Sequence, residues 1–403
     1  MTTTSFATGD PRTQKQWSAD VFEYALQNIR LTPLMGSDRN SCIHVNKALE
    51  KSKGDVVQFT RRNPLSGAGL GDDSRTVGYE MQMTRGNFEV KVHERANSVI
   101  SAGKISDQRT ATNIRQEAKT DLGDCLAEAL ENDLVSCMAG LYNENSSGAA
   151  IETINEAYPT IHASVATSAR IYFGGQTAAG AVQAFGAYDT DATLTGAGAA
   201  TDHLMGTKVL SLIKRIATLC APKFRPISLS DTKSGIPMGE YYLCLLHPYQ
   251  IKAIKAETGE NGWNNMVANA AVKGNQNPLF AGAAFLHDGI ICWEYDRIPM
   301  RTGAGGTAVT EGFALNAGRT ATSDACASAR SVARALFLGA QALCFAWAQN
   351  PKWYESLEDG GRIPKVSLDM IYGVGRTNFN THGTSTPTLE QAIYCIDTEV
   401  VAD

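Results

Sequence analysis

Several local patterns in the sequence approach a known chemistry, and each lacks a residue that the chemistry needs. His93 and Glu94 begin like the zinc-binding helix motif H-E-x-x-H, but Asn97 stands where the second histidine ligand is required. Gly103 and Lys104 have neither the upstream glycine nor the following Ser or Thr of a phosphate-binding loop. These segments therefore predict neither a zinc peptidase nor a nucleotide phosphate site.

Two further patterns fail in the same way. The three alternating glycines of residues 67–71 do not open a helix, as the glycines of a dinucleotide-binding turn must. Asp189 and Asp191 are spaced like the start of a calcium-binding loop, but Leu194 takes the glycine position and Ala200 the glutamate position. We accordingly expect no cofactor, no metal site, no catalytic residues and no enzymatic activity.

The cysteines and histidines are dispersed along the chain. Nine cysteines, an odd number, show no C-x-x-C spacing, so we expect reduced thiols, several of them packed as small apolar residues. The seven histidines form no motif, and for His247, which precedes Pro248, we expect hydrogen bonds to local backbone groups. Neither set predicts a disulfide framework or a metal centre.

The composition is that of a globular protein with a large core. Of 403 residues, 43% are hydrophobic and 19% are charged, and the net charge of −5 does not suit a surface that binds nucleic acid phosphates throughout. No export signal is visible, and as a helix the longest apolar run, Ala335–Ala348, would reach about 21 Å against a hydrocarbon core of about 30 Å. We expect this run to form buried core and the chain to have no membrane partner.

The elements that would position functional residues follow from the apolar spacing. Residues 1–52 are largely polar, and Ala19–Arg30 has a helical spacing that Pro33 ends. A lone amphipathic helix has no core of its own, so we expect it to pack on a neighbouring subunit. Residues 55–61 and 87–93 alternate as two antiparallel strands do, and the glycine-rich connection between them is far longer than a hairpin turn.

A long helix and a mixed block follow. Residues 107–142 carry apolar side chains at four-residue intervals, and a helix of that length spans about 54 Å, which favours a structural strut. Ala, Gly, Ser and Thr fill 25 of the 38 residues from 163 to 200, where we expect irregular strand-and-turn structure. The pattern beyond residue 202 is α/β, with predicted helices over 204–219 and 249–256 and strands over 241–246, 289–293, 366–372 and 392–396.

The order of these elements resembles that of the major capsid proteins of tailed double-stranded DNA bacteriophages, which share the Johnson fold (the Hong Kong phage capsid fold). Lys53–Phe59 resembles the entry to the extended E-loop of that family. Leu245–Pro248 before a helix resembles the strand-to-helix step of its axial domain, and residues 288–299 resemble a late strand of that domain. Leu338–Ala342 resembles the segment that returns to the peripheral domain.

The resemblance implies an α+β fold with a defined division of the chain. The parts are an N-arm (1–52), an E-loop (53–98), a peripheral domain (99–204) with a spine helix (107–142) and an Ala/Gly-rich insertion, an axial domain (205–335), and a return to the peripheral domain (336–403). The implied function is self-assembly into hexamers and pentamers of an icosahedral shell around double-stranded DNA. Such a protein is made in the bacterial cytoplasm and resides in the virion.

The resemblance also implies partners and contact residues. The partners would be other copies of the chain, a portal, a decoration protein and the packaged DNA, bound without sequence specificity. Because no fused scaffolding domain is evident and residues 54–90 contain no lysine, we expect a separate scaffolding protein and no lysine crosslink in the E-loop. The candidate inter-subunit residues are aromatic residues of the arm and charged residues of the E-loop: Trp17, Phe22, Arg61, Arg62, Asp72, Asp73, Arg75, Glu80 and Arg85.

Two other functions stay open at this point. An encapsulin-type nanocompartment has the same fold but encloses protein cargo, so nucleic-acid content would separate it from a phage capsid. An unrecognised cytosolic α/β enzyme would instead be a monomer or small oligomer, with a loop 62–79 that is ordered without a partner.

Overall fold

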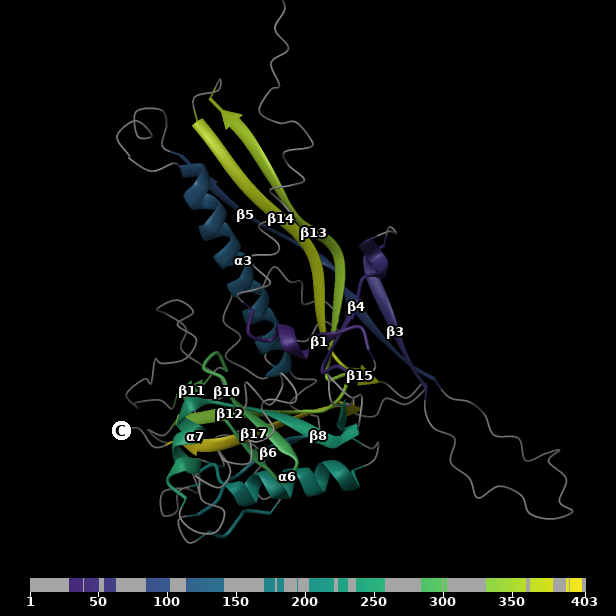
Figure 1. The fold of residues 1–403 in the computed structure, drawn as a ribbon, viewed down its shortest axis with the longest axis vertical. Helices are drawn as coiled ribbons and strands as arrows, with labels where there is room; N and C mark the ends of the chain where they lie inside the picture. The colour runs from purple at the N-terminus through teal and green to yellow at the C-terminus, as the bar shows by residue number, and fades with distance from the viewer. Residues whose placement is uncertain are drawn as a thin grey trace, which may run out of the picture.

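Two β-sheets, one long helix and a two-stranded ribbon make up the fold (Figure 1). The structure is a computed structural model, and it describes residues 29–38, 40–50, 54–62, 85–101, 114–140, 170–177, 180–184, 194, 203–220, 224–230, 237–257, 284–298, 300–302, 331–359, 363–379, 389–390 and 392–400. The separate helices and mainly antiparallel strand pairs confirm the predicted α+β class.

The eight-stranded sheet forms the lower body in Figure 1, and helices α6 and α7 lie against it. Its strands run in the order β6-β17-β12-β8-β10-β9, with β11 beside β12 and β7 beside β8. The bounds are β6 Ile171–Phe173, α6 Thr207–Leu219, β7 Ile227–Ser230, β8 Pro237–Leu246, α7 Pro248–Lys255, β9 Phe285–His287, β10 Ile290–Glu294, β11 Met300–Thr302, β12 Ser331–Leu338 and β17 Ile393–Val400. The predicted helices and strands of this region are confirmed within a few residues.

Burial on both faces explains why these strands read as continuous apolar runs. All eight residues of β17 are buried, as are the first four of β10. Among its described residues, the Ala/Gly-rich region joins the same sheet through the short strand β6, beside which Gln176 forms isolated bridges to Val182 and Leu204. At residues 170–177 and 180–184 this agrees with the predicted strand-and-turn structure, and the rest of 163–200 except Leu194 lies outside the described residues.

The five-stranded sheet forms the upper body, with strand order β1-β2-β13-β14-β5 (Figure 1). The bounds are β1 Met35–Gly36, β2 Ile43–Asn46, β5 His93–Ile100, β13 Leu343–Glu358 and β14 Ile363–Arg376. Short elements flank it: the 3-10 helices η1 Thr32–Leu34 and η2 Ala48–Glu50, and the paired strands β15 Asn378–Phe379 and β16 Leu389–Glu390. Of the helix expected over 19–30, residues 19–28 lie outside the described residues, and Ile29 and Arg30 are not helical.

The long apolar run is buried, as predicted, and it connects the two sheets. Residues up to Leu338 belong to β12 of the eight-stranded sheet, and residues from Leu343 belong to β13 of the five-stranded sheet. The turn between them includes Gln341, whose φ of 57° places it in the left-handed region. One stretch of apolar sequence therefore supplies core to both halves of the molecule.

Helix α3, Ile114–Met138, runs beside the five-stranded sheet toward the eight-stranded one (Figure 1). Its predicted apolar face is confirmed, because every described member of that face is buried: Ala118, Leu122, Leu126, Leu130, Leu134 and Met138. The predicted range 107–142 was too long at its C-terminal end, since Gly140, with a φ of 75°, turns the chain out of the helix. Residues 107–113 and 141–142 lie outside the described residues.

Candidate assembly site

The ribbon consists of two strands that pair with each other alone among the described strands. They are β3 Val56–Arg62 and β4 Arg85–Lys91, which pair antiparallel in the register Val57↔Val90 and Phe59↔Phe88. Figure 1 shows them on the far side of β13 and β14 from α3. Both outer edges of the ribbon thus present backbone groups to which no described strand pairs, and an isolated two-stranded ribbon has little stability of its own.

The base of the ribbon is fixed by a small apolar cluster. Val57 and Val90 are buried against Cys344 and Ala346 of β13, and Leu49, Phe59 and Val92 pack around them. Burial of a valine side chain contributes about 1.5–3 kcal/mol, so this contact is enough to anchor the base but involves few residues. Of the ribbon side chains that the structure describes, Val57, Phe59 and Val90 therefore face the protein's own body.

The ribbon leaves the body where the backbone of β4 passes very close to the backbone of β14. A Cβ atom added at Gly373 of β14 would lie 2.0 Å from the carbonyl oxygen of Lys91, far inside van der Waals contact. Only glycine allows β4 to cross β14 at this distance. Gly373 therefore permits the close crossing that, together with the apolar cluster, sets the direction of the ribbon.

The structure describes three of the nine predicted contact residues. Arg61, Arg62 and Arg85 lie on the ribbon strands, where Arg62 is the register partner of Arg85 and Arg61 that of Gly86. The remaining candidates lie outside the described residues: Trp17, Phe22, Asp72, Asp73, Arg75 and Glu80. Their role in inter-subunit contact stays a prediction.

The long helix is attached to the five-stranded sheet through a buried carboxylate. Asp133 of α3 lies 3.0 Å from Arg95 of β5 and accepts a hydrogen bond from the hydroxyl of Tyr372 on β14. Burial raises the pKa of Asp133 to about 6, although the Arg95 guanidinium and the Tyr372 hydroxyl both act to lower it. One side chain thus ties α3 to two strands of the sheet.

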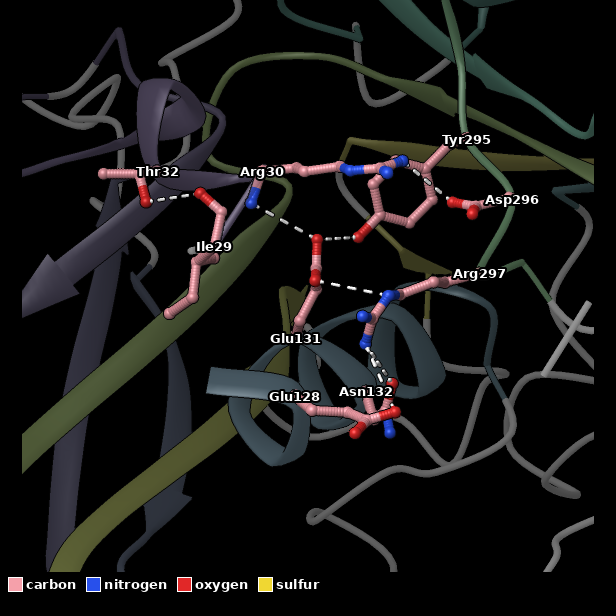
Figure 2. A network of polar contacts seen from close by, with 9 residues as sticks. All are labelled: Ile29, Arg30, Thr32, Glu128, Glu131, Asn132, Tyr295, Asp296 and Arg297. Atoms are coloured by element: carbon pink, nitrogen blue, oxygen red, sulfur yellow. Dashed lines mark hydrogen bonds and ion pairs between the residues drawn. The ribbon is translucent and has the colours of Figure 1, made fainter. Parts of the chain in front are cut away.

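A second buried carboxylate, Glu131, joins three parts of the chain (Figure 2). Its Oε1 accepts hydrogen bonds from the Arg30 backbone N–H, at 3.3 Å, and from the Tyr295 hydroxyl, and its Oε2 lies 3.4 Å from Nε of Arg297. Arg297 also donates to Asn132 of α3 at 3.2 Å. This junction holds the start of the described chain and the segment after β10 to the long helix.

A third anchor holds the C-terminal end of the helix to the eight-stranded sheet. Arg334 of β12 and Asp397 of β17 are register partners and form a bidentate ion pair at 2.7 and 2.6 Å, with both side chains at most 2% exposed. The remaining Nη1 of Arg334 donates to the carbonyl oxygen of Ala139, just past the helix. That carbonyl lies at the negative end of the helix dipole, where a cation is stabilising.

The three anchors together make α3 a strut between the two sheets. Their residues were not predicted from the sequence: Arg95, Glu131, Asp133, Tyr295, Arg297, Arg334, Tyr372 and Asp397. A signal exists for two of them, because Arg334 interrupts the largely apolar strand β12 and Asp397 directly follows the apolar start of β17, so both need buried partners. The carboxylates of α3 give no such signal, since acidic residues are frequent all along that helix.

The histidine and cysteine side chains that could take part in catalysis or metal binding have structural roles instead. His247 accepts a hydrogen bond from the Tyr249 N–H through Nδ1 and caps α7, as predicted, and burial lowers its pKa to about 4. Six of the eight described cysteines are buried, and burial raises the pKa of Cys42 and of Cys344 to about 12, which leaves these thiols protonated. Within the described residues, no group of His, Cys, Asp and Glu is arranged to bind a metal ion, and no helix is long and apolar enough to cross a membrane.

Comparisons with known proteins agree with the fold. The family model of phage capsid proteins matches residues 5–402. A major capsid protein of Pseudomonas phage KPP25 is 24% identical over 387 residues, which cover 93% of this chain and 92% of that protein.

Two solved capsids are similar in structure. The capsid of Ralstonia phage GP4 has a TM-score of 0.67 at 21% identity and covers 100% of this chain and 99% of its own. The capsid of cyanophage Pam1 has a TM-score of 0.66 at 22% identity, with 100% of both chains covered. These two likenesses show the fold, which is the Hong Kong phage capsid fold that the order of elements resembled.

The family match, the relative and the shared fold support one function, that of a phage major capsid protein. They do not favour a nanocompartment or an unrecognised enzyme. The chain therefore belongs to the family of phage capsid proteins, and its place is the capsid of the virion.

Proposed function

We propose that the chain assembles into hexamers and pentamers that tile an icosahedral shell around double-stranded DNA. The observation that carries the proposal is the ribbon β3–β4, which packs on its own body through the cluster around Val57 and Val90 and whose outer edges pair with no described strand. A ribbon of this kind gains order by lying across a second subunit, where its edges and its alternating face find partners. The rings arise from heterologous contacts that close on themselves.

The division of labour within the subunit follows from the two sheets and the strut between them. In this proposal residues 1–52 act as N-arm, 53–98 as E-loop, 99–204 and 336–403 as peripheral domain and 205–335 as axial domain. Strands β6 and β17 share a sheet with β8 and β12, so we assign these two strands to the axial domain as well. The spine helix α3 then fixes the angle between the domains through its three anchors.

The proposed partners of the subunit are those of a shell protein. They are further copies of the chain, a separate scaffolding protein, a portal, a decoration protein and DNA held without sequence-specific contacts. The net charge of −5 supports the last point, since a basic lining would retain the genome. The role is structural, with no enzymatic activity, and membership of a capsid family supports this assignment.

The variant Gly373→Ala tests the ribbon's part in assembly. The added Cβ collides with the Lys91 carbonyl and must displace the ribbon, so we expect closed shells to be lost or strongly reduced. Ser367→Ala on the same strand β14 is the matched control and should assemble like the parent chain. Shell yield is measured by gradient sedimentation and electron microscopy, and the thermal transition of the unassembled subunit reports its folding. Normal shell yield from Gly373→Ala would contradict the proposed use of the ribbon.

A further inference from the structure

A hollow lies on the surface of the eight-stranded half, apart from the ribbon and the three anchors of α3. It has a volume of about 680 Å³ and lies between α6, the turn after β9 and residues 182–184. Thr207, Lys208, Ser211, Leu212 and Arg215 line it from successive turns of α6. His287 and Asp288 line it from the turn after β9.

The charges around the hollow leave a net positive site. Lys208 donates to the carbonyl of Gly180 at 2.7 Å, which holds its ammonium group at the rim without neutralising it. Asp288, which also lines the hollow, is paired with Lys214 at 2.7 Å. Arg215 is exposed and lines the hollow, and its guanidinium fork is suited to a carboxylate or a phosphate.

The other walls select among anions. Nε2 of His287 lies 3.0 Å from Oγ of Ser211, and burial lowers the pKa of His287, so the imidazole is neutral and adds no charge. Val182, Ala184 and Leu212 give an apolar wall. The start of α6 adds no anion site, because the carboxylate of Glu257 already accepts from the Thr207 N–H at 3.2 Å. The hollow thus fits a carboxylate on an apolar stem, as in a Glu or Asp side chain.

We propose that this hollow receives an acidic side chain from a second copy of the chain in the shell, with Arg215 and Lys208 as the receiving cations. The inference rests on the proposed assembly. Charge complementarity supports it, since a positive hollow on a chain with net charge −5 matches the prevailing charge of its own copies. DNA fits less well, because a duplex is too wide to enter the hollow.

Charge reversal at Arg215 tests the inference on the full-length chain. Arg215→Glu puts two carboxylates together in the contact, so we expect shell yield to fall at least tenfold while the unassembled subunit keeps its thermal transition. The matched control is Lys252→Glu, which reverses an exposed cation on α7 outside the hollow and should leave the yield unchanged. The neutral variant Arg215→Gln should give an intermediate yield.

A cryo-electron microscopy map of the parent shell completes the test. Density of a neighbouring subunit's carboxylate at hydrogen-bond distance from Arg215 would support the inference. Shells formed at normal yield by Arg215→Glu would overturn it, as would a hollow that contains only solvent, a small anion or DNA. If the parent chain forms no shells when it is produced with its scaffolding protein, the proposed assembly fails first, so the two failures are distinguishable.

Discussion

The buried ion pair between Arg334 and Asp397 offers the sharpest test of how the subunit is held together. Replacing Arg334 with Met leaves the Asp397 carboxylate, which is 0% exposed, without its two charged hydrogen bonds. Breaking a buried pair by removing one partner costs about 3–5 kcal/mol. Because a domain's free energy of unfolding is about 5–15 kcal/mol, this single change removes a large share of it.

A double-mutant cycle separates the pair from the rest of its surroundings. Asp397→Leu should cost a similar amount, since it leaves the buried guanidinium without its carboxylate. The double variant has no charge at these two positions. Its free energy of unfolding should fall by about 1–3 kcal/mol, mainly because the Ala139 carbonyl loses its donor. The coupling energy should therefore reach at least about 3 kcal/mol.

Urea unfolding of the unassembled subunit measures these free energies. The control is Lys365→Met, which breaks the exposed pair of Lys365 and Glu358 at 3.0 Å and should cost no more than about 1 kcal/mol. A cost below about 1 kcal/mol for Arg334→Met, or additive single changes, would refute the view that this pair secures the end of α3.

Three further predictions concern the same strut. Burial raises the pKa of Asp133 from 3.8 to about 6, so the folded state binds this proton more tightly than the unfolded state does. The resulting contribution to the free energy of unfolding, about 3 kcal/mol, is fully present below pH 4 and is lost as the pH rises through 6. Unfolding of Asp133→Asn between pH 4 and 7 should lack this slope, and an unchanged slope would disprove the assignment. Tyr295→Phe should lower the free energy of unfolding in urea by about 1–3 kcal/mol, because it removes a donor to the buried Glu131. The control Tyr354→Phe, at an exposed site, should change it by almost nothing. Equal changes in the two variants would be inconsistent with the junction at Glu131. Gly140→Ala should lower the free energy of unfolding by about 1 kcal/mol, because the φ of 75° strains any residue with a Cβ, and a stabilising effect would show that the turn is not fixed.

Local patterns predicted the elements whose partners are nearby or whose burial is uniform. The four-residue spacing predicted the buried face of α3, and alternation predicted the ribbon strands with Val57 and Phe59 on one side. Uniform burial made β10 and β17 readable as apolar runs. These features depend on residues that are close together in the chain.

The missed elements depend on distant residues. β5 was not predicted, because its sequence lacks apolar alternation. The face of β5 that contacts α3 does so through polar side chains such as Arg95. β13 continues past Pro351, an unusual residue within a strand, because the register shifts between Trp347 and Lys352 absorb it. The anchors join Glu131 and Tyr295 across 164 positions and Asp133 and Tyr372 across 239, which no local pattern records.

A cryo-electron microscopy reconstruction of the phage particle that contains this chain tests the central claim most directly. We expect an icosahedral shell tiled by the chain in rings of six and five, in which the strands Val56–Arg62 and Arg85–Lys91 of each subunit lie across a neighbour. A shell built from a different protein, or subunits whose ribbons contact only their own bodies, would contradict the account.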